Sequence, residues 1–152
     1  MADETVSVRR NGVLLLAAIV LTFAILRSFL HLAPDTDLNV GRYNIHHLFT
    51  GLLLITAGGI PLAIFRGSPR RLDWAILAFG AGLGMALDQW VFLIATDGSN
   101  ASYLLPVSFW GGVVVTGSAV IYAVLLVRWG TGRRNGDRSP TAAFTLFRVR
   151  RR

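Results

Sequence analysis

The chain contains no cysteine and no lysine, so all fifteen of its basic residues are arginine. The absence of cysteine excludes disulfides, thiolate metal sites, iron–sulfur clusters and thiol catalysis. Charge is also scarce: 15% of the residues are charged and 53% are hydrophobic, whereas soluble domains carry roughly 25% charged residues. At 152 residues the length suits one domain. The composition therefore indicates a small membrane protein.

Four long apolar runs make up most of the sequence, at 12–32, 43–65, 72–95 and 104–129. Each is long enough for a membrane-crossing helix, which needs about 20 residues, and too long for an alternating barrel strand. Arg27 and His31 interrupt the first run, which argues against a cleaved signal peptide. We predict an all-α protein, a four-transmembrane-helix bundle with a leader at 1–11 and an arginine-rich tail at 130–152.

The arginines predict the orientation. Thirteen lie in the leader, in the turn between the second and third runs, and towards the C-terminus, while Arg42 alone lies in the other two loops. The positive-inside rule then places both termini in the cytoplasm. We expect a multi-pass protein of a prokaryotic inner membrane, with Tyr43, Tyr103 and Trp110 in the outer aromatic belt.

The formal net charge of +7 could suggest nucleic acid as a partner. The charges lie mostly outside the apolar runs and at one membrane face, so anionic lipids are the simpler partner and we expect no nucleic acid. The tail either lies on the inner leaflet, at roughly 1 kcal/mol per arginine, or acts only as a determinant of topology.

Small residues crowd the third run. In a helix, Gly80, Ala81, Gly84 and Asp88 fall on one face. Such a face lets helix backbones approach closely in lipid, and it could also serve a homo-oligomer or another membrane partner. A carboxylate that continues this face is a functional-site hypothesis, because ionisable groups inside a membrane are costly.

Other polar residues fall at the same depth. At 1.5 Å per residue, Asp88 lies roughly 10 Å below the outer end of its run, and Arg27 lies similarly deep in the first run. We therefore predict one polar cluster in the outer leaflet, formed by Arg27, His31, His46, His47, Asp88 and Gln89.

The facing of these residues can also be predicted. His47 shares a face with Gly51 and Gly58, which places it towards another helix. Arg27 shares a face with Ala17, Val20 and Ala24, which favours an inward direction for that face as well.

Three functions fit this cluster. In the first, Arg27 and Asp88 form a buried ion pair that holds the bundle together, and the cluster binds a partner or a small ligand. In the second, His47, Asp88 and His46 bind a transition metal, or His31 and His47 ligate a haem, and the protein acts on lipid or quinone. In the third, the protein is an oligomeric transport component, and the ion pair lies on the path that an ion or a proton takes through it.

Two enzyme classes find little support. Gly80, Gly82 and Gly84 lie inside an apolar run with no strand before them, which excludes a dinucleotide-binding fingerprint. Ser28 and Ser108 are not in a nucleophile turn.

Two segments carry a resemblance. Residues 43–51 (Tyr-Asn-Ile-His-His-Leu-Phe-Thr-Gly) and 80–89 (Gly-Ala-Gly-Leu-Gly-Met-Ala-Leu-Asp-Gln) resemble a family of small prokaryotic membrane proteins of four spans. The members carry a His-His pair in the second span and a glycine-rich span ending in Leu-Asp-Glu or a close variant. The resemblance implies the fold and implies that the His pair and Asp88 belong to one pattern; it implies no reaction. Gln89 stands where an acid is usual, which argues against a two-metal carboxylate site.

Overall fold

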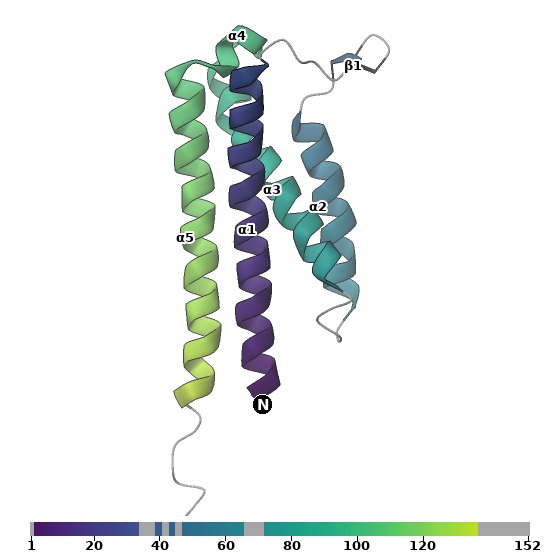
Figure 1. Ribbon diagram of the computed structural model, residues 1–152, viewed down its shortest axis with the longest axis vertical. Helices are drawn as coiled ribbons and strands as arrows, with labels where there is room; N and C mark the ends of the chain where they lie inside the picture. Colours follow the sequence, from purple (N-terminus) through teal and green to yellow (C-terminus); the bar gives the residue numbers. More distant parts are fainter. Residues whose placement is uncertain (1, 34–38, 41–42, 45–46, 66–71, 137–152) are drawn as a thin grey trace, which may run out of the picture.

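The computed structural model describes residues 2–33, 39–40, 43–44, 47–65 and 72–136 (Figure 1). Its main elements are the helices α1 (Ala2–Leu32), α2 (His47–Ile64), α3 (Asp73–Ala95) and α5 (Pro106–Gly136), with a short helix α4 (Asn100–Tyr103) before α5. Two strands of two residues, β1 (Asn39–Val40) and β2 (Tyr43–Asn44), pair antiparallel. Among the residues that the structure describes, four helices are long and apolar enough to cross a membrane. The prediction of a helical protein with four candidate membrane spans is therefore confirmed.

The helix bounds differ from the predicted ones most clearly at the start of α1, at the start of α2 and at both ends of α5, which ends at Gly136 rather than at Trp129. Helix α1 begins at Ala2 rather than near residue 12, because residues 2–11 contain neither proline nor glycine to stop a helix. Helix α2 begins at His47 rather than at Tyr43, which belongs to β2. The last long helix begins at Pro106, a residue that suits the first position of a helix.

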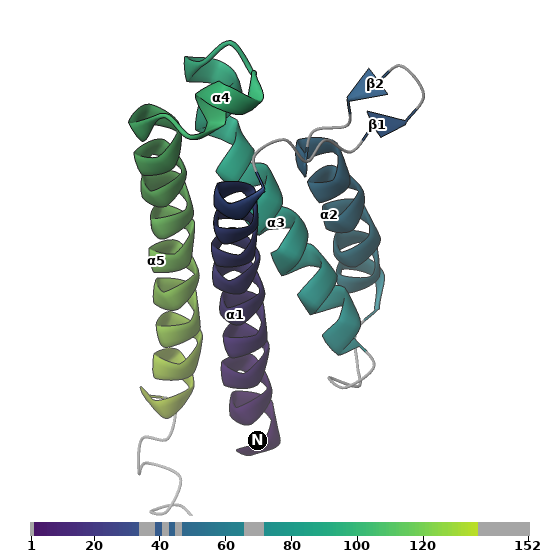
Figure 2. The ribbon, with the colours of Figure 1, turned by 45° about the horizontal axis from the view of Figure 1, so that its top comes forward.

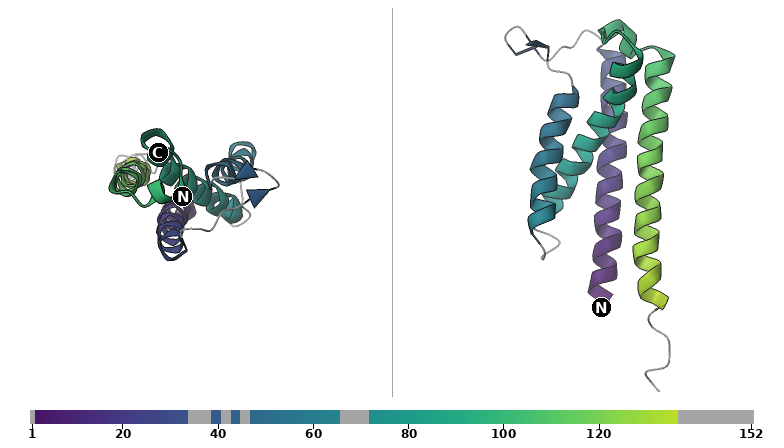
Figure 3. Two further views of the ribbon diagram at one scale, coloured as in Figure 1. Left: turned by 90° about the horizontal axis from the view of Figure 1, so that it is seen from above. Right: turned by 180° about the vertical axis from the view of Figure 1, so that it is seen from behind.

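Helix α3 occupies the centre of the fold and contacts all three other long helices. Viewed from above, α2 lies on one side of α3, and α1 and α5 lie on the other (Figure 3). Figure 2 shows the same arrangement, with α4 between the end of α3 and the start of α5. The start of α1 and the end of α5 lie at the same end of the bundle (Figure 1).

The glycines of α3 explain how one helix can hold so many neighbours. A Cβ at Gly82 would lie 2.5 Å from the carbonyl oxygen of Gly51 in α2. A Cβ at Gly84 would lie 2.8 Å from the carbonyl oxygen of Ile19 in α1, and one at Gly80 would lie 2.7 Å from Cβ of Ala18. Real Cβ atoms are not tolerated this close to a backbone, so α3 has two glycine faces, one for α2 and one for α1.

The remaining surface is strongly apolar. Large side chains such as Leu53, Ile94, Trp110 and Val114 are more than half exposed. Exposed apolar surface on this scale is unusual in a soluble monomer, and lipid tails are its natural solvent. The helices thus pack largely through small residues and keep most of their large apolar residues outside, although Ile19, Ile76 and Phe92 are buried.

Candidate functional site

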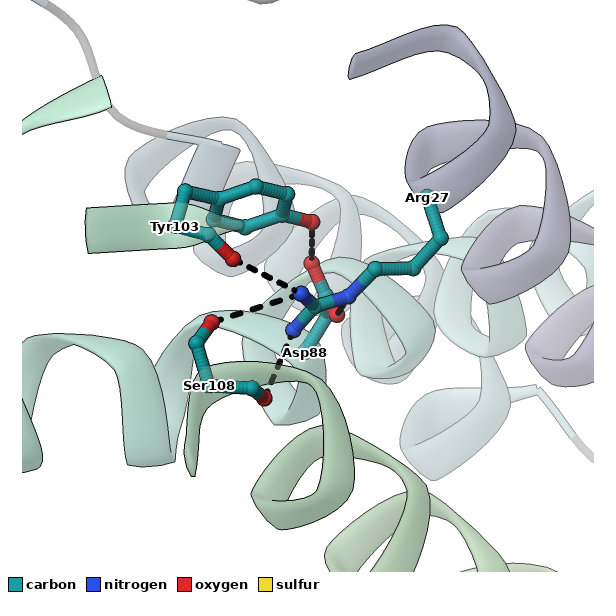
Figure 4. A network of polar contacts seen from close by, with 4 residues as sticks. All are labelled: Arg27, Asp88, Tyr103 and Ser108. Carbon is teal, nitrogen blue, oxygen red and sulfur yellow. Dashed lines mark hydrogen bonds and ion pairs between the residues drawn. The ribbon is translucent and has the colours of Figure 1, made fainter. Parts of the chain in front are cut away.

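The centre of the polar site is the side chain of Arg27, which projects from α1 towards α3 and α5 (Figure 4). Its Nε donates to Oδ1 of Asp88 at 2.5 Å, and its Nη2 donates to the carbonyl oxygen of Ser108 at 2.9 Å. Nη1 donates to the carbonyl oxygen of Tyr103 at 3.2 Å and to Oγ of Ser108 at 3.3 Å. One guanidinium therefore links α1 to α3, α4 and α5, and the expected pairing of Arg27 with Asp88 is present.

Asp88 is the acceptor at the middle of this network and is completely buried. Besides Arg27, its carboxylate accepts a hydrogen bond from the hydroxyl of Tyr103 (Figure 4). Both charges are thus compensated, as a buried pair requires, because an ion left alone in hydrocarbon costs several kcal/mol.

Glycines make room for the pair. Gly84 lies one turn before Asp88 and allows α1 to approach. On α5, a Cβ at Gly112 would lie 2.9 Å from Nη2 of Arg27 and 3.1 Å from Oδ1 of Asp88. Any larger residue at position 112 would displace the ion pair, so this glycine belongs to the site.

Tyr103 occupies a different environment from the predicted one. We expected it in the outer aromatic belt, but its side chain is buried, with an exposed fraction of 5%. Its ring lies 4.2 Å from the guanidinium carbon of Arg27 and meets the ring of Phe92 edge-on at 5.1 Å. Burial, reinforced by the neighbouring charge of Asp88, raises the pKa of the Tyr103 phenol. The phenol therefore stays protonated and remains a donor to the carboxylate.

The loop before α4 brings Tyr103 to this place. Oγ of Ser99 caps α4 by accepting from the backbone N–H of Ser102. Asp97 in turn accepts from the backbone N–H of Ser99 at 3.0 Å and from its hydroxyl at 2.8 Å. The backbone N–H of Ser99 and the hydroxyls of Ser102 and Ser99 lower the pKa of Asp97 to about 2. The polar loop is thus folded back over the bundle by its own serine and aspartate side chains.

The other predicted site residues lie in different surroundings. His47 begins α2 and lies within electrostatic range of Asp88. Gln89 is buried two turns beyond Gly82, on the face of α3 that α2 covers. Its Oε1 has no hydrogen-bond partner in the part of the chain that the structure describes. His31 is exposed at the end of α1, and His46 lies outside the described residues.

The face predicted for α1 is wrong. Ala17, Val20 and Ala24, which were expected to point inward with Arg27, are exposed. The inward face instead contains Ala18, Ile19 and Thr22, which meet the glycines of α3. Arg27 still reaches the interior because its side chain is long and flexible.

A pocket of about 670 Å³ adjoins the ion pair at the end of the bundle where α1 ends and α5 begins. It lies between α1, α4 and α5, and Arg27 forms part of its wall. Its other polar lining residues are Ser28 and His31 of α1, and its aromatic lining residues are Tyr103, Phe109 and Trp110. A cavity of this size is typical of sites for small molecules, which span roughly 300–1,000 Å³.

The geometry of the described residues adds no support for a metal or haem site. Within the described residues, no three side chains of His, Cys, Asp or Glu come together as a metal site. His31 lines the pocket beside α5, whereas His47 lies on α2, which packs against α3. The two imidazoles that would ligate a haem therefore belong to different interfaces.

Tyr103, Ser108 and Gly112 were not predicted as site residues. A signal was available on α5, where Ser108, Gly112 and Thr116 recur every fourth residue and are all buried. Tyr103 gave no such signal, because its burial depends on the fold of the loop before it.

The fold and the site define a multi-pass helical membrane protein with a buried ion pair beside a pocket at one end of the bundle. Comparison of the chain with protein-family models, with curated proteins and with solved structures finds no match. The function is therefore argued from the site alone.

Proposed function

We propose that the protein is a four-span protein of a prokaryotic inner membrane that binds a small ligand in the pocket between α1, α4 and α5. The observation that carries the proposal is the position of Arg27: it forms the pocket wall and is held there by Asp88, Tyr103 and Ser108. A wall residue fixed by a buried network keeps its geometry in the absence of ligand, which is the usual condition of a binding site.

The proposed orientation places both termini in the cytoplasm and the pocket at the outer face. Within the described residues, Arg9 and Arg10 lie near the start of α1 and Arg128, Arg133 and Arg134 lie near the end of α5, and the pocket lies at the opposite end of the bundle. Positive residues favour the cytoplasmic side, and the arginine-rich tail would lie near anionic lipids there. The glycine faces of α3 are occupied by α1 and α2, so an assembly of several copies would need other surfaces.

Filling the pocket tests the proposal. Ser28 lines the pocket and is exposed on α1, so Ser28→Phe should occupy the cavity without crossing the ion pair. Native mass spectrometry of protein extracted from its membrane should show a bound small molecule on the wild type and its loss from Ser28→Phe.

The matched control is Ser118→Phe. Ser118 is also an exposed serine on a long helix, but its hydroxyl bonds the carbonyl of Val114 away from the pocket. This variant should keep the bound molecule. An identical set of bound molecules on all three proteins, or none on the wild type, would contradict the proposed function.

A further inference from the structure

We infer that the ligand of this pocket is a quinone-like lipid, with a flat carbonyl-bearing ring as its head and a hydrocarbon tail. The inference rests on the proposed function and adds to it the chemistry of the ligand. It concerns binding alone.

The polar wall of the pocket is rich in hydrogen-bond donors. Arg27 can only donate, although four of its five N–H groups already donate within the protein. Ser28 and His31 can each donate and accept. No carboxylate lines the pocket among the described residues, because Asp88 is directed at Arg27 and Tyr103. The wall therefore favours a ligand that offers acceptor oxygens.

The charge of the wall favours a neutral acceptor over an anion. The guanidinium of Arg27 lies 2.5 Å from the carboxylate of Asp88, so the pair contributes no net charge to the pocket. Anion sites use arginine whose charge is available to the ligand. A carbonyl oxygen accepts a hydrogen bond without needing that charge, and it therefore fits better than a phosphate.

The apolar wall favours a flat ring. Tyr103, Phe109 and Trp110 contribute three aromatic rings to one pocket. The ring of Tyr103 is fixed between Phe92 and Arg27, and its hydroxyl is already used by Asp88. Because Tyr103 is buried, the ring surface open to a ligand belongs mainly to Phe109 and Trp110, which are 40% and 63% exposed. Aromatic faces pack well against other rings.

The surroundings of the pocket favour entry from the bilayer. Leu32, Phe109 and Trp110 line the pocket and are exposed on the outside of the bundle. On helices that cross a membrane, such side chains face lipid. A hydrocarbon tail can therefore remain between α1 and α5 in the acyl chains while the ring occupies the pocket.

Tryptophan fluorescence tests the inference. In nanodiscs, a variant that keeps only Trp110 (Trp74→Phe, Trp90→Phe, Trp129→Phe) would be titrated with decylubiquinone, which quenches tryptophan. We expect saturable quenching of Trp110. His31→Ala and Ser28→Ala should each raise the Kd by about tenfold, the ratio expected for one lost hydrogen bond.

Two controls separate binding from partition into lipid. A variant that keeps only Trp90, which lies on α3 outside the pocket lining, should show quenching that rises without saturation. Ser118→Ala should leave the Kd unchanged, because Ser118 lies away from the pocket.

Two results would overturn the inference. One is quenching of Trp110 that never saturates. The other is preferential quenching of Trp110 by brominated phosphatidylglycerol over brominated phosphatidylcholine, with no saturable effect of decylubiquinone; the ligand would then be an anionic phospholipid. In both cases the proposed function is judged separately, by the molecule lost from Ser28→Phe.

Discussion

Helices α1 and α3 run in the same direction and cross at an angle (Figure 1). Among the described residues, two ion pairs with very different surroundings join them. Arg10 pairs with Asp73 where both side chains are about one third exposed, at 34% and 30%. Arg27 pairs with Asp88 where the exposed fractions are 9% and 0%. The first pair is partly exposed on the surface of the bundle, and the second is enclosed by protein.

The partners of the two pairs differ in the same way. Arg27 also donates to Tyr103 and Ser108, and Asp88 also accepts from Tyr103. In the other pair, Oδ1 of Asp73 has no hydrogen-bond partner within the described part of the chain. The same two residue types thus form a buried, connected unit at one end of the interface and a simple pair at the other. The difference shows that residue type alone does not reveal which of the two ion pairs is enclosed and connected to other groups.

The largest expected effect comes from removing one charge of the buried pair. Asp88→Asn leaves the Arg27 guanidinium buried without its counter-ion, which should lower the free energy of unfolding by about 3–5 kcal/mol. Reversible unfolding in mixed detergent micelles would measure this loss. A loss below about 1 kcal/mol, the range of exposed pairs, would show that the Arg27–Asp88 pair behaves like an exposed pair.

Tyr103→Phe should have an intermediate effect. The change keeps the ring, its contact with Phe92 and its position over Arg27, and removes only the hydrogen bond to Asp88. We expect a loss of about 1–2 kcal/mol in the same unfolding experiment. Tyr122→Phe is the matched control, because Tyr122 is exposed on α5, and equal losses in both variants would argue against a role for the buried hydroxyl.

The exposed pair should matter less. Asp73→Asn removes the charge partner of Arg10, and we expect a loss of about 0–1 kcal/mol that shrinks as salt is added. Unfolding at low and high salt would measure it. A loss as large as that of Asp88→Asn, or one insensitive to salt, would show that this pair is also enclosed.

The smallest effect is expected from Asp97, in the loop that positions Tyr103. Its pKa is lowered from 3.8 to about 2 by hydrogen bonds from Ser99 and Ser102. A carboxyl with a lowered pKa stabilises the folded loop above its ordinary pKa, and this contribution disappears as the pH falls from about 4 to about 2. The amide chemical shift of Ser99 should follow this titration with a midpoint near 2. A midpoint near 3.8 would show that these hydrogen bonds do not form.

The sequence was informative wherever a residue's place follows from helix periodicity and depth. The four long helices, the burial of Gly80, Gly84 and Asp88 on α3, and the approach of Arg27 to Asp88 all follow from those two regularities. Periodicity predicted the wrong inward face for α1, because arginine can reach the interior from the edge of a face.

The structure of the loop that positions Tyr103 could not be predicted from the sequence. Tyr103 enters the site because Ser99 caps α4 and Asp97 holds Ser99. These contacts depend on the three-dimensional course of the loop, and tyrosine near a membrane boundary is more often interfacial. The pocket also depends on that loop, since α4 supplies Tyr103 to its wall.

Double-mutant cycles on the two ion pairs test the central claim most directly. The cycles combine Arg27→Met with Asp88→Leu and Arg10→Met with Asp73→Leu, each measured by reversible unfolding. We predict a coupling energy of about 2–3 kcal/mol for Arg27 and Asp88 and of at most about 0.5 kcal/mol for Arg10 and Asp73. Equal coupling energies, or none between Arg27 and Asp88, would contradict the claim that the buried pair joins α1 to α3 at the pocket.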